Sequence, residues 1–185
     1  MKGPFARKKS RLFTWVHRAS LGTGHLAQGL IVIAPCDGGG PVLIEERVAF
    51  DGDPAAVWAR LSDIDRIPEF WHGTRSLQVL SRAKQGDVES AKAKAKFAFG
   101  GTGEVEITAD GGAMTLTSDY VSGPFKGKQV VRVAGNALEA RWDVSFTGVF
   151  KLTSGWTGGH FRSGTVHALE RLAGKAAPET KAAQA

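Results

Sequence analysis

The chain has 185 residues, a net charge of +6 and a single cysteine, Cys36. This length fits one domain that buries a core without the help of disulfide bonds or metal ions, with some unstructured sequence at its flanks. One cysteine excludes an internal disulfide and a cysteine-based metal site, which is typical of a cytoplasmic protein. The sequence contains no run of about eighteen apolar residues, so we expect no stable membrane insertion.

The surplus of positive charge lies in the first 41 residues. This segment contains six basic residues and one acidic residue, Asp37, which gives a net charge of +5. The rest of the chain contains 18 basic and 17 acidic residues, a net charge of +1. A domain that binds nucleic acid normally carries its basic surplus on its own folded face, so we expect no nucleic-acid partner. Residues 1–41 show no regular helical or strand pattern and are predicted to be a basic, disordered extension.

Three interpretations of this extension remain. A secretory signal is disfavoured, because Arg18 and several glycines interrupt the apolar stretch and no A-x-A site occurs. A basic interaction arm would use Phe13 and Trp15. The favoured interpretation is read-through from a start codon placed too far upstream. Codons for the glycines at 38–40 are compatible with a ribosome-binding sequence before a start at Val42.

Residues 53–80, DPAAVWARLSDIDRIPEFWHGTRSLQVL, predict a helix, a second short helix and a strand. Asp53 is a typical N-cap and Pro54 fits the first helical position. The first helix then has an apolar stripe at helical spacing, made of Val57, Trp58 and Leu61. Asp65 is placed to cap a second helix with an apolar cluster, made of Ile67, Pro68, Phe70 and Trp71. From Arg75 on, apolar and polar residues alternate as in a half-buried strand.

The segment VWARLSDIDRIPEFW in this stretch resembles the START-like superfamily, also called SRPBCC, and the resemblance extends over roughly residues 42–173. It implies an α+β helix-grip fold, in which a curved antiparallel sheet of about seven strands wraps around a long C-terminal helix. Two short helices follow the first strand, and a cavity lies between sheet and helix. Members bind lipids, sterols, polyketides, quinones or similar apolar molecules, and some are polyketide cyclases. We therefore expect a START-like ligand-binding domain at residues 42–174 and a disordered tail at 175–185.

Residues 42–50 predict the first strand. Its apolar face also holds Glu46, which would place a carboxylate in or near the cavity. The favoured alternative puts Glu46 at the edge of the sheet, or in an ion pair with an arginine such as Arg132 or Arg141.

Residues 87–99 show the clearest strand periodicity in the sequence. One face carries Ala91, Ala93, Ala95, Phe97 and Phe99, and the other carries Lys92, Lys94 and Lys96. Small residues on a concave face leave volume that either a bulky neighbour or a ligand fills. The lysine row is most simply a solvated face, with anion or membrane-surface contact as the alternative.

Glycine-rich turns separate the remaining strands into an antiparallel meander. The turns are Gly100-Gly101, Asp110-Gly111-Gly112, Ser122-Gly123-Pro124 and Gly135-Asn136. The last two strands are expected at residues 129–134 and 138–150. None of the turns leads from a strand into a helix, which disfavours a phosphate-binding loop.

A long helix is expected at residues 157–173. Its inner stripe comprises Phe161, Gly164, Thr165, Ala168, Leu169 and Leu172. His160, Ser163 and His167 are predicted to lie away from this stripe.

The sequence contains no motif that identifies a catalytic residue. The five histidines lack metal-ligand spacing, and no G-x-S-x-G motif occurs. Asp63 and Asp65 are interpreted as helix caps rather than as a pair of catalytic carboxylates. A cyclase would need an acid–base pair in an apolar pocket, for which the candidates are Glu46, Tyr120, Arg132 and His72.

The favoured function is binding or carriage of an apolar small molecule, without cofactor or metal. The predicted ligand-binding residues are Trp58, Phe70, Trp71, Ala91, Ala93, Ala95, Phe97, Leu116, Tyr120, Trp142, Phe161, Thr165 and Leu169. The alternatives are an enzyme of the polyketide cyclase or dehydratase type and a co-chaperone-like interaction module. Polar residues converging in the pocket would favour the enzyme, and an exposed apolar groove would favour the interaction module.

Overall fold

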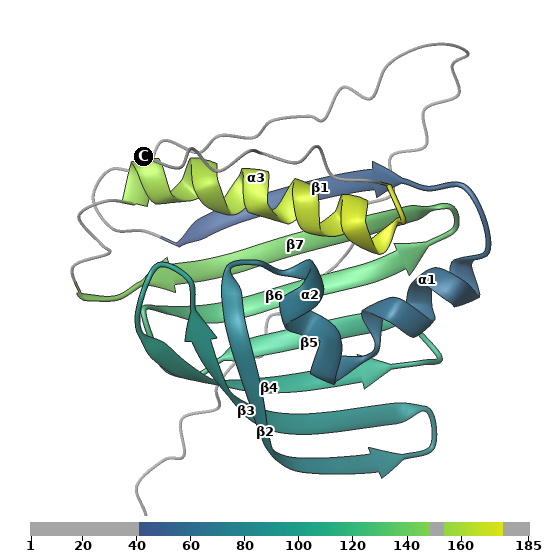
Figure 1. Cartoon of the computed structure of the whole chain (residues 1–185), viewed down its shortest axis with the longest axis horizontal. Helices are drawn as coiled ribbons and strands as arrows, with labels where there is room; N and C mark the ends of the chain where they lie inside the picture. The colour runs from purple at the N-terminus through teal and green to yellow at the C-terminus, as the bar shows by residue number, and fades with distance from the viewer. Residues whose placement is uncertain (1–40, 149–153, 176–185) are drawn as a thin grey trace, which may run out of the picture. The chain divides into compact units, whose positions relative to one another are not determined.

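Seven antiparallel strands form one sheet in the computed structural model, which describes residues 41–148 and 154–175 (Figure 1). The strands are β1 (Val42–Ala49), β2 (Thr74–Gln85), β3 (Val88–Phe97), β4 (Thr102–Asp110), β5 (Thr115–Tyr120), β6 (Phe125–Ala134) and β7 (Ala137–Phe146). The helices are α1 (Pro54–Leu61), the short 3-10 helix η1 (Ile64–Arg66), α2 (Ile67–Phe70) and α3 (Ser154–Leu172). This arrangement confirms the predicted helix-grip fold.

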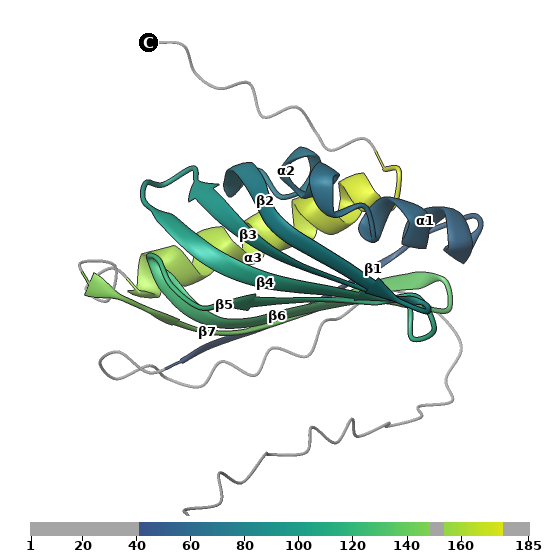
Figure 2. The same ribbon diagram turned by 90° about the horizontal axis from the view of Figure 1, so that it is seen from below.

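The strand order β1-β7-β6-β5-β4-β3-β2 puts the first two strands at opposite edges of the sheet. The chain therefore has to cross the whole sheet between them, and α1, η1 and α2 make this crossing. Figure 2 shows that the sheet curves around α3, with α1 and α2 on the same side. Helix α3 packs on β1 and β7 and contacts both α1 and α2. The concave face is thus covered by α3 along one side and by the connecting helices along the other.

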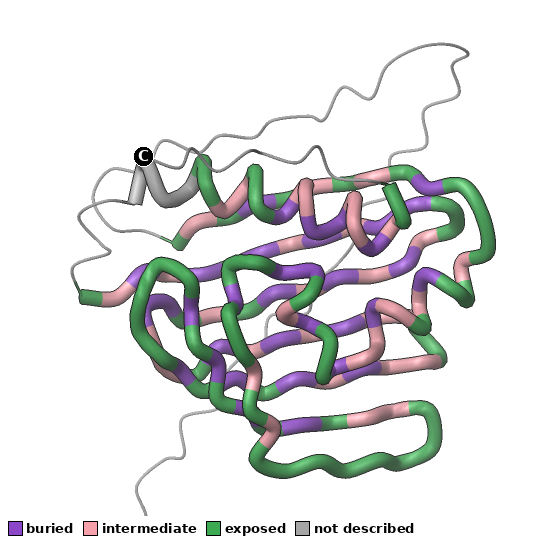
Figure 3. The backbone as a smooth tube through the Cα atoms, in the orientation of Figure 1, coloured by how far each residue is buried: buried purple, intermediate pink, exposed green. Residues whose placement is uncertain are grey.

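Burial alternates along the strands as the sequence predicts (Figure 3). In β3 the three alanines and Phe97 are buried, and the three lysines are exposed. Lys92 and Lys94 lie opposite Glu106 and Glu104 of β4, and the Lys92 ammonium is 2.9 Å from the Glu106 carboxylate. The hydrogen bond to Glu106 raises the pKa of Lys92. Cross-strand charge pairing therefore offsets much of the lysine row, which favours a solvated face over an anion-binding one.

Several boundaries differ from the predicted ones by a few residues. Strand β6 begins at Phe125 rather than at residue 129, and β7 ends at Phe146 rather than at residue 150. Phe125 pairs with Phe146 at the end of the ladder, and Gly148 then adopts a left-handed φ of 55° that a strand cannot contain. Helix α3 starts at Ser154 rather than at residue 157. The glycine pair at 158–159 lies inside the helix, although glycine is a poor helix former.

The caps of the short helices are only partly as predicted. Asp53 caps α1, since its Oδ1 accepts a hydrogen bond of 2.9 Å from the Ala55 amide. The prediction for Asp65 is wrong: no side chain caps η1 or α2, and Asp65 instead binds Arg82 of β2 at 2.8 Å. The Asp65 carboxylate therefore forms an ion pair with the Arg82 guanidinium instead of a hydrogen bond with a backbone amide at the helix end.

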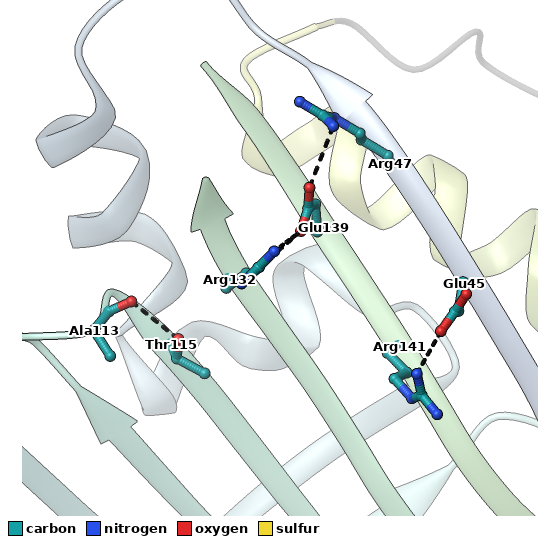
Figure 4. Close-up of polar contacts among 7 residues, drawn as sticks. All are labelled: Glu45, Arg47, Ala113, Thr115, Arg132, Glu139 and Arg141. Carbon is teal, nitrogen blue, oxygen red and sulfur yellow. Dashed lines mark hydrogen bonds and ion pairs between the residues drawn. The ribbon is translucent and has the colours of Figure 1, made fainter. Parts of the chain in front are cut away.

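Ion pairs on the convex face connect β6, β7 and β1 (Figure 4). Glu139 lies 2.6 Å from Arg132 and 3.4 Å from Arg47, and Arg141 lies 2.6 Å from Glu45. The arginines expected to pair with a concave-face carboxylate are therefore engaged on the opposite side of the sheet.

Glu46 lies on the edge strand β1, as the favoured interpretation expected, but its partner is different. The Arg162 Nε of α3 donates a hydrogen bond to Glu46 Oε1. The alternation of the strand turns Glu46 toward α3, whereas Arg132 and Arg141 point to the other face. The pair joins α3 to the sheet and does not supply a carboxylate to the cavity described below.

Two glycines allow close contact between backbones where the sheet bends. A Cβ on Gly103 would lie 2.1 Å from the Ser122 carbonyl oxygen, and one on Gly127 would lie 2.2 Å from the Asp143 carbonyl oxygen. Gly127 also has a φ of +129°, which favours glycine. Both positions lie toward the ends of β4 and β6 that adjoin the Phe97–Gly101 and Ser122–Pro124 turns.

The predictions for the basic extension, for most of the tail and for the final residues of the last strand fall outside the described residues. The proposed domain limits of 42 and 174 therefore stay predictions. None of the described helices is long and apolar enough to cross a membrane.

Candidate functional site

A cavity of about 400 Å³ opens between α3 and one end of the sheet. Its walls come from four places: the α2–β2 turn, the β3–β4 turn, the facing strands β5, β6 and β7, and the C-terminal two-thirds of α3. The lining residues are Trp71, His72, Gly73, Thr74, Phe97, Phe99, Tyr120, Phe125, Trp142, His160, Phe161, Gly164, Thr165, His167 and Arg171. The volume lies within the range of pockets that hold small molecules.

Aromatic rings form most of the cavity wall. Trp142 is at the centre: its ring stacks on Tyr120 at 5.8 Å, and the edges of Trp71 and Phe161 meet it at 5.9 Å and 5.3 Å. Phe125 contacts Tyr120, Phe161 and Phe97 at centroid distances of 4.6 to 5.2 Å. Ring pairs at these distances hold one another in place, so the wall is a rigid apolar surface.

A small group of buried polar side chains lies at the floor of this wall. Ser118, Gln129 and Trp142 are directly opposite one another on β5, β6 and β7, and the Tyr120 hydroxyl donates a 3.4 Å hydrogen bond to Gln129 Oε1. Burial raises the pKa of the Tyr120 phenol well above its ordinary value, and a hydrogen bond with Ser118 opposes this in part. The phenol therefore stays protonated and is a donor at neutral pH.

The indole N–H of Trp142 is the polar group most relevant to a ligand. Trp142 is 6% exposed, and its Nε1 has no hydrogen-bond partner among the described residues. A buried donor without a partner costs free energy of about 1–3 kcal/mol. Because Trp142 lines the cavity, an acceptor oxygen on a bound molecule is one way to recover that cost.

The mouth of the cavity is basic. His72 comes from the α2–β2 turn, and His160, His167 and Arg171 come from α3. The Arg171 Nη1 donates a 2.6 Å hydrogen bond to the Phe70 carbonyl oxygen, which ties α3 to α2. Partial burial lowers the pKa of Arg171, and the neighbouring Glu170 carboxylate opposes this; a guanidinium stays charged at neutral pH all the same.

About half of the sequence-predicted residues line this cavity. Those that do are Trp71, Phe97, Tyr120, Trp142, Phe161 and Thr165. Trp71 is 8% exposed and rests on Trp142, so α2 is packed against the wall and is not an open lid.

The three alanines of β3 are buried but do not line the cavity. Ala91, Ala93 and Ala95 are 4%, 1% and 1% exposed and belong to the same core cluster as Ile64, Ile67 and Phe70 of η1 and α2. Helix α2 packs on β2, the neighbour of β3. Because the alanines are buried and lie outside the cavity wall, protein side chains fill the volume beside them, which is the first of the two alternatives that the sequence left open.

The remaining predicted residues are also core or lie elsewhere. Phe70, Leu116 and Leu169 are buried without lining the cavity. Trp58 is half-buried and lines a separate, smaller pocket of about 220 Å³ near Gly111, in the turn after β4. The nine residues of β4 run from the main cavity to this turn, a distance of about 27–30 Å, so Trp58 lies at the wrong end of the sheet.

The predicted ligand-binding residues omitted seven side chains of the cavity, of which His72 was named only as an acid–base candidate. The seven are His72, Thr74, Phe99, Phe125, His160, His167 and Arg171. Four belong to turns or to strands whose starts were predicted too late. A signal existed for α3, because residues 160, 164, 167 and 171 follow helical spacing beside the apolar stripe. His160 and His167 thus line the cavity, contrary to the prediction that they lie away from the inner side.

The chemistry available at the cavity is limited to imidazoles, hydroxyls and one guanidinium. No aspartate or glutamate of the described residues lines it. Of the acid–base candidates, His72 and Tyr120 line the cavity, whereas Glu46 and Arg132 are engaged elsewhere in ion pairs. Within the described ranges, no group of three or more His, Cys, Asp or Glu residues could hold a metal ion.

Comparison with known proteins supports the fold and its class. Residues 51–172 match the family model described as polyketide cyclase / dehydrase and lipid transport. A comparison with curated proteins found no match.

Solved structures resemble the described fold at low sequence identity. A Thermus thermophilus protein is similar with a TM-score of 0.51 and 15% identity, over 74% of this chain and 99% of that one. A START superfamily protein from Mycobacterium smegmatis has a TM-score of 0.50 and 15% identity, over 72% and 99%. The Zhui aromatase/cyclase from a Streptomyces species has a TM-score of 0.52 and 12% identity, over 71% and 91%. At these identities the likeness shows the fold alone.

Proposed function

This chain belongs to the polyketide cyclase / dehydrase and lipid transport family, and we propose that it binds one apolar small molecule in the cavity between α3 and the sheet. The observation that carries the proposal is the cavity itself: about 400 Å³ bounded by the rings of Trp71, Phe97, Tyr120, Phe125, Trp142 and Phe161. An open, largely apolar cavity of this size, lined by aromatic rings with a few polar groups, is the usual form of a small-molecule site and favours a ligand.

The wall favours a molecule that is flat or slender and carries an acceptor oxygen. Stacked and edge-on rings present broad apolar surfaces, which suit an aromatic system or a hydrocarbon chain. The Trp142 N–H, buried without a partner among the described residues, adds a donor that an acceptor oxygen of the ligand would satisfy. A lipid carbonyl, a quinone oxygen or a polyketide-like ketone each meets these requirements.

Native mass spectrometry of the purified protein tests the proposal, because a bound apolar molecule shifts the mass by one ligand. The same protein is titrated with phenylnaphthylamine, a neutral dye that fluoresces in apolar surroundings. We expect saturable binding with one dye per chain, and weaker binding of a probe with an acceptor oxygen in Trp142→Phe, which keeps a ring and removes the N–H. A protein that carries no ligand and binds no apolar probe contradicts the proposal.

A cyclase or dehydratase activity in the same cavity is the second candidate. It is favoured by the imidazole of His72 and the phenol of Tyr120, which share the cavity and could move a proton at a carbon next to a ketone. Incubation with a linear polyketone, followed by absorbance of an aromatic product, tests it. Loss of product in His72→Gln with unchanged dye binding supports the enzyme, and no product from the natural protein refutes it.

A co-chaperone-like interaction module has less support. The exposed large apolar side chains of the described residues are those of Leu43, Leu80, Phe99 and Val121. Leu43 and Leu80 lie on β1 and β2, the opposite edges of the sheet, so the four do not form one groove. The single cysteine of the chain fits binding in the reducing cytoplasm, which we propose as the location.

A further inference from the structure

One side of α3 carries a stripe of basic residues next to its buried apolar stripe. His160, Gly164, His167 and Arg171 follow one another at spacings of four, three and four residues, so they share one face of the helix. All four line the cavity. The buried stripe, with Thr165, Ala168, Leu169 and Leu172, fixes the helix on the sheet and thereby fixes the direction of the basic stripe.

The charges around the cavity have one sign. Arg171 supplies a permanent positive charge, and His72, His160 and His167 supply imidazole rings. No carboxylate of the described residues lines the cavity, and Glu170, next to Arg171 in sequence, is not part of its wall. A neutral apolar ligand gives no reason for such an imbalance at the entrance of an aromatic pocket.

We propose that the ligand is an amphiphile with an anionic head group, a carboxylate or a phosphate, which lies against the His160–His167–Arg171 stripe while its apolar body lies among the aromatic rings. This inference rests on the proposed function and adds the charge of the ligand and its orientation.

The position of Arg171 suits this role. Its side chain is partly buried, so it faces less competition from water than a surface lysine would. A guanidinium has five N–H donors, and the contact with the Phe70 carbonyl oxygen holds the group in place while it uses one of them. The geometry of the remaining donors matches the two oxygens of a carboxylate or a phosphate.

Two dyes with the same ring system separate charge from hydrophobic binding. Anilinonaphthalene sulfonate carries an anionic group, and phenylnaphthylamine has the same rings without it. We expect Arg171→Met to weaken binding of the sulfonate by about three- to tenfold, the range for a partly exposed ion pair, and to change binding of the neutral dye by less than about twofold. The comparison of two dyes and two proteins cancels effects that both dyes share.

A second variant guards against loss of the α3–α2 contact in Arg171→Met. His167 takes no part in that contact, and His167→Glu adds a negative charge at the mouth. It should therefore weaken binding of the sulfonate by a similar factor and leave binding of the neutral dye unchanged. Lys175→Met is the matched control, because it removes one positive charge just beyond α3, away from the cavity. It should alter the binding of neither dye.

Competition then identifies the head group. Dodecanoate and dodecyl phosphate should displace the neutral dye at lower concentration than dodecanol does, and whichever anion is stronger names the source. Equal competition by all three, or equal effects of both variants on the two dyes, overturns the inference while the proposed function stands. Failure of both dyes and all three competitors to bind the natural protein refutes the proposed function itself.

Discussion

Replacement of Gly164 by leucine should stabilise the protein and weaken its ligand binding. An ideal Cβ at Gly164 meets no atom within 4 Å, although the residue lines the cavity. The added side chain therefore extends into the cavity without a clash at its Cβ. Stability and binding should change in opposite directions, which a merely damaging substitution cannot do.

The expected magnitudes follow from the position of Gly164 in the interior of α3. Leucine is a better helix former than glycine by about 0.5–1 kcal/mol, and burial of part of its side chain against the rings adds to this. The melting temperature should rise by a few degrees. Displacement of a ligand from part of its pocket should lower affinity at least about tenfold, which corresponds to about 1.4 kcal/mol.

Gly159→Leu is the matched control. Gly159 lies in the same helix, is exposed, and likewise has no atom within 4 Å of an ideal Cβ, but it does not line the cavity. Thermal unfolding and titration with phenylnaphthylamine should show that both variants gain stability and that only Gly164→Leu loses dye binding. Unchanged dye binding in Gly164→Leu would refute the position of the ligand beside α3.

Three further predictions test the surrounding structure. Gly127→Ala should lower the free energy of unfolding by at least about 2 kcal/mol in a denaturant titration, because the Cβ would lie 2.2 Å from the Asp143 carbonyl oxygen; a neutral effect would mean that β6 is straighter than described. Ala93→Phe should cost about 1–3 kcal/mol and leave dye affinity the same, because Ala93 is 1% exposed and does not line the cavity; accommodation of the ring would reveal free volume there. Burial raises the pKa of Tyr120, so the folded protein keeps a proton that the unfolded chain loses above about pH 10. The contribution of Tyr120 to the free energy of unfolding should therefore be constant below that pH and fall by up to about 1.4 kcal/mol per pH unit above it. Since Tyr120 is the only tyrosine, tyrosinate absorbance should appear only as the protein unfolds, and a reversible titration near pH 10 in the folded protein would show that the phenol is accessible to water.

The fold could be predicted because its signals are local. Alternation along β3 follows from the two faces of one strand, the Asp53 cap and Pro54 mark one helix start, and glycine-containing turns separate successive hairpins. Each of these depends on neighbours within a few residues. The boundary errors occurred where such signals conflict, as in α3, where two adjacent glycines lie inside a helix.

The site was harder to predict because it depends on which distant elements meet. Asp65 pairs with Arg82, and Arg162 pairs with Glu46, over separations of 17 and 116 residues. No spacing rule connects such positions. His72 and Phe99 reach the cavity from two turns that come together only when the sheet curves, so their local sequence carries no sign of a pocket.

The expectation that small residues mark a cavity is reversed in this fold, for a physical reason. An alanine row lets another element approach the sheet closely, and η1 and α2 share the core cluster that holds Ala93. Large rings instead hold elements apart: Trp142 and Phe161 meet in a T-shaped pair with centroids 5.3 Å apart and keep α3 at a distance from the end of the sheet. Rings that brace one another cannot collapse into the space between them, since each is held by its neighbours. The cavity therefore persists at the aromatic end of the concave face, where the basic stripe of α3 reaches its mouth, and a ligand would be selected there by shape inside and by charge at the entrance.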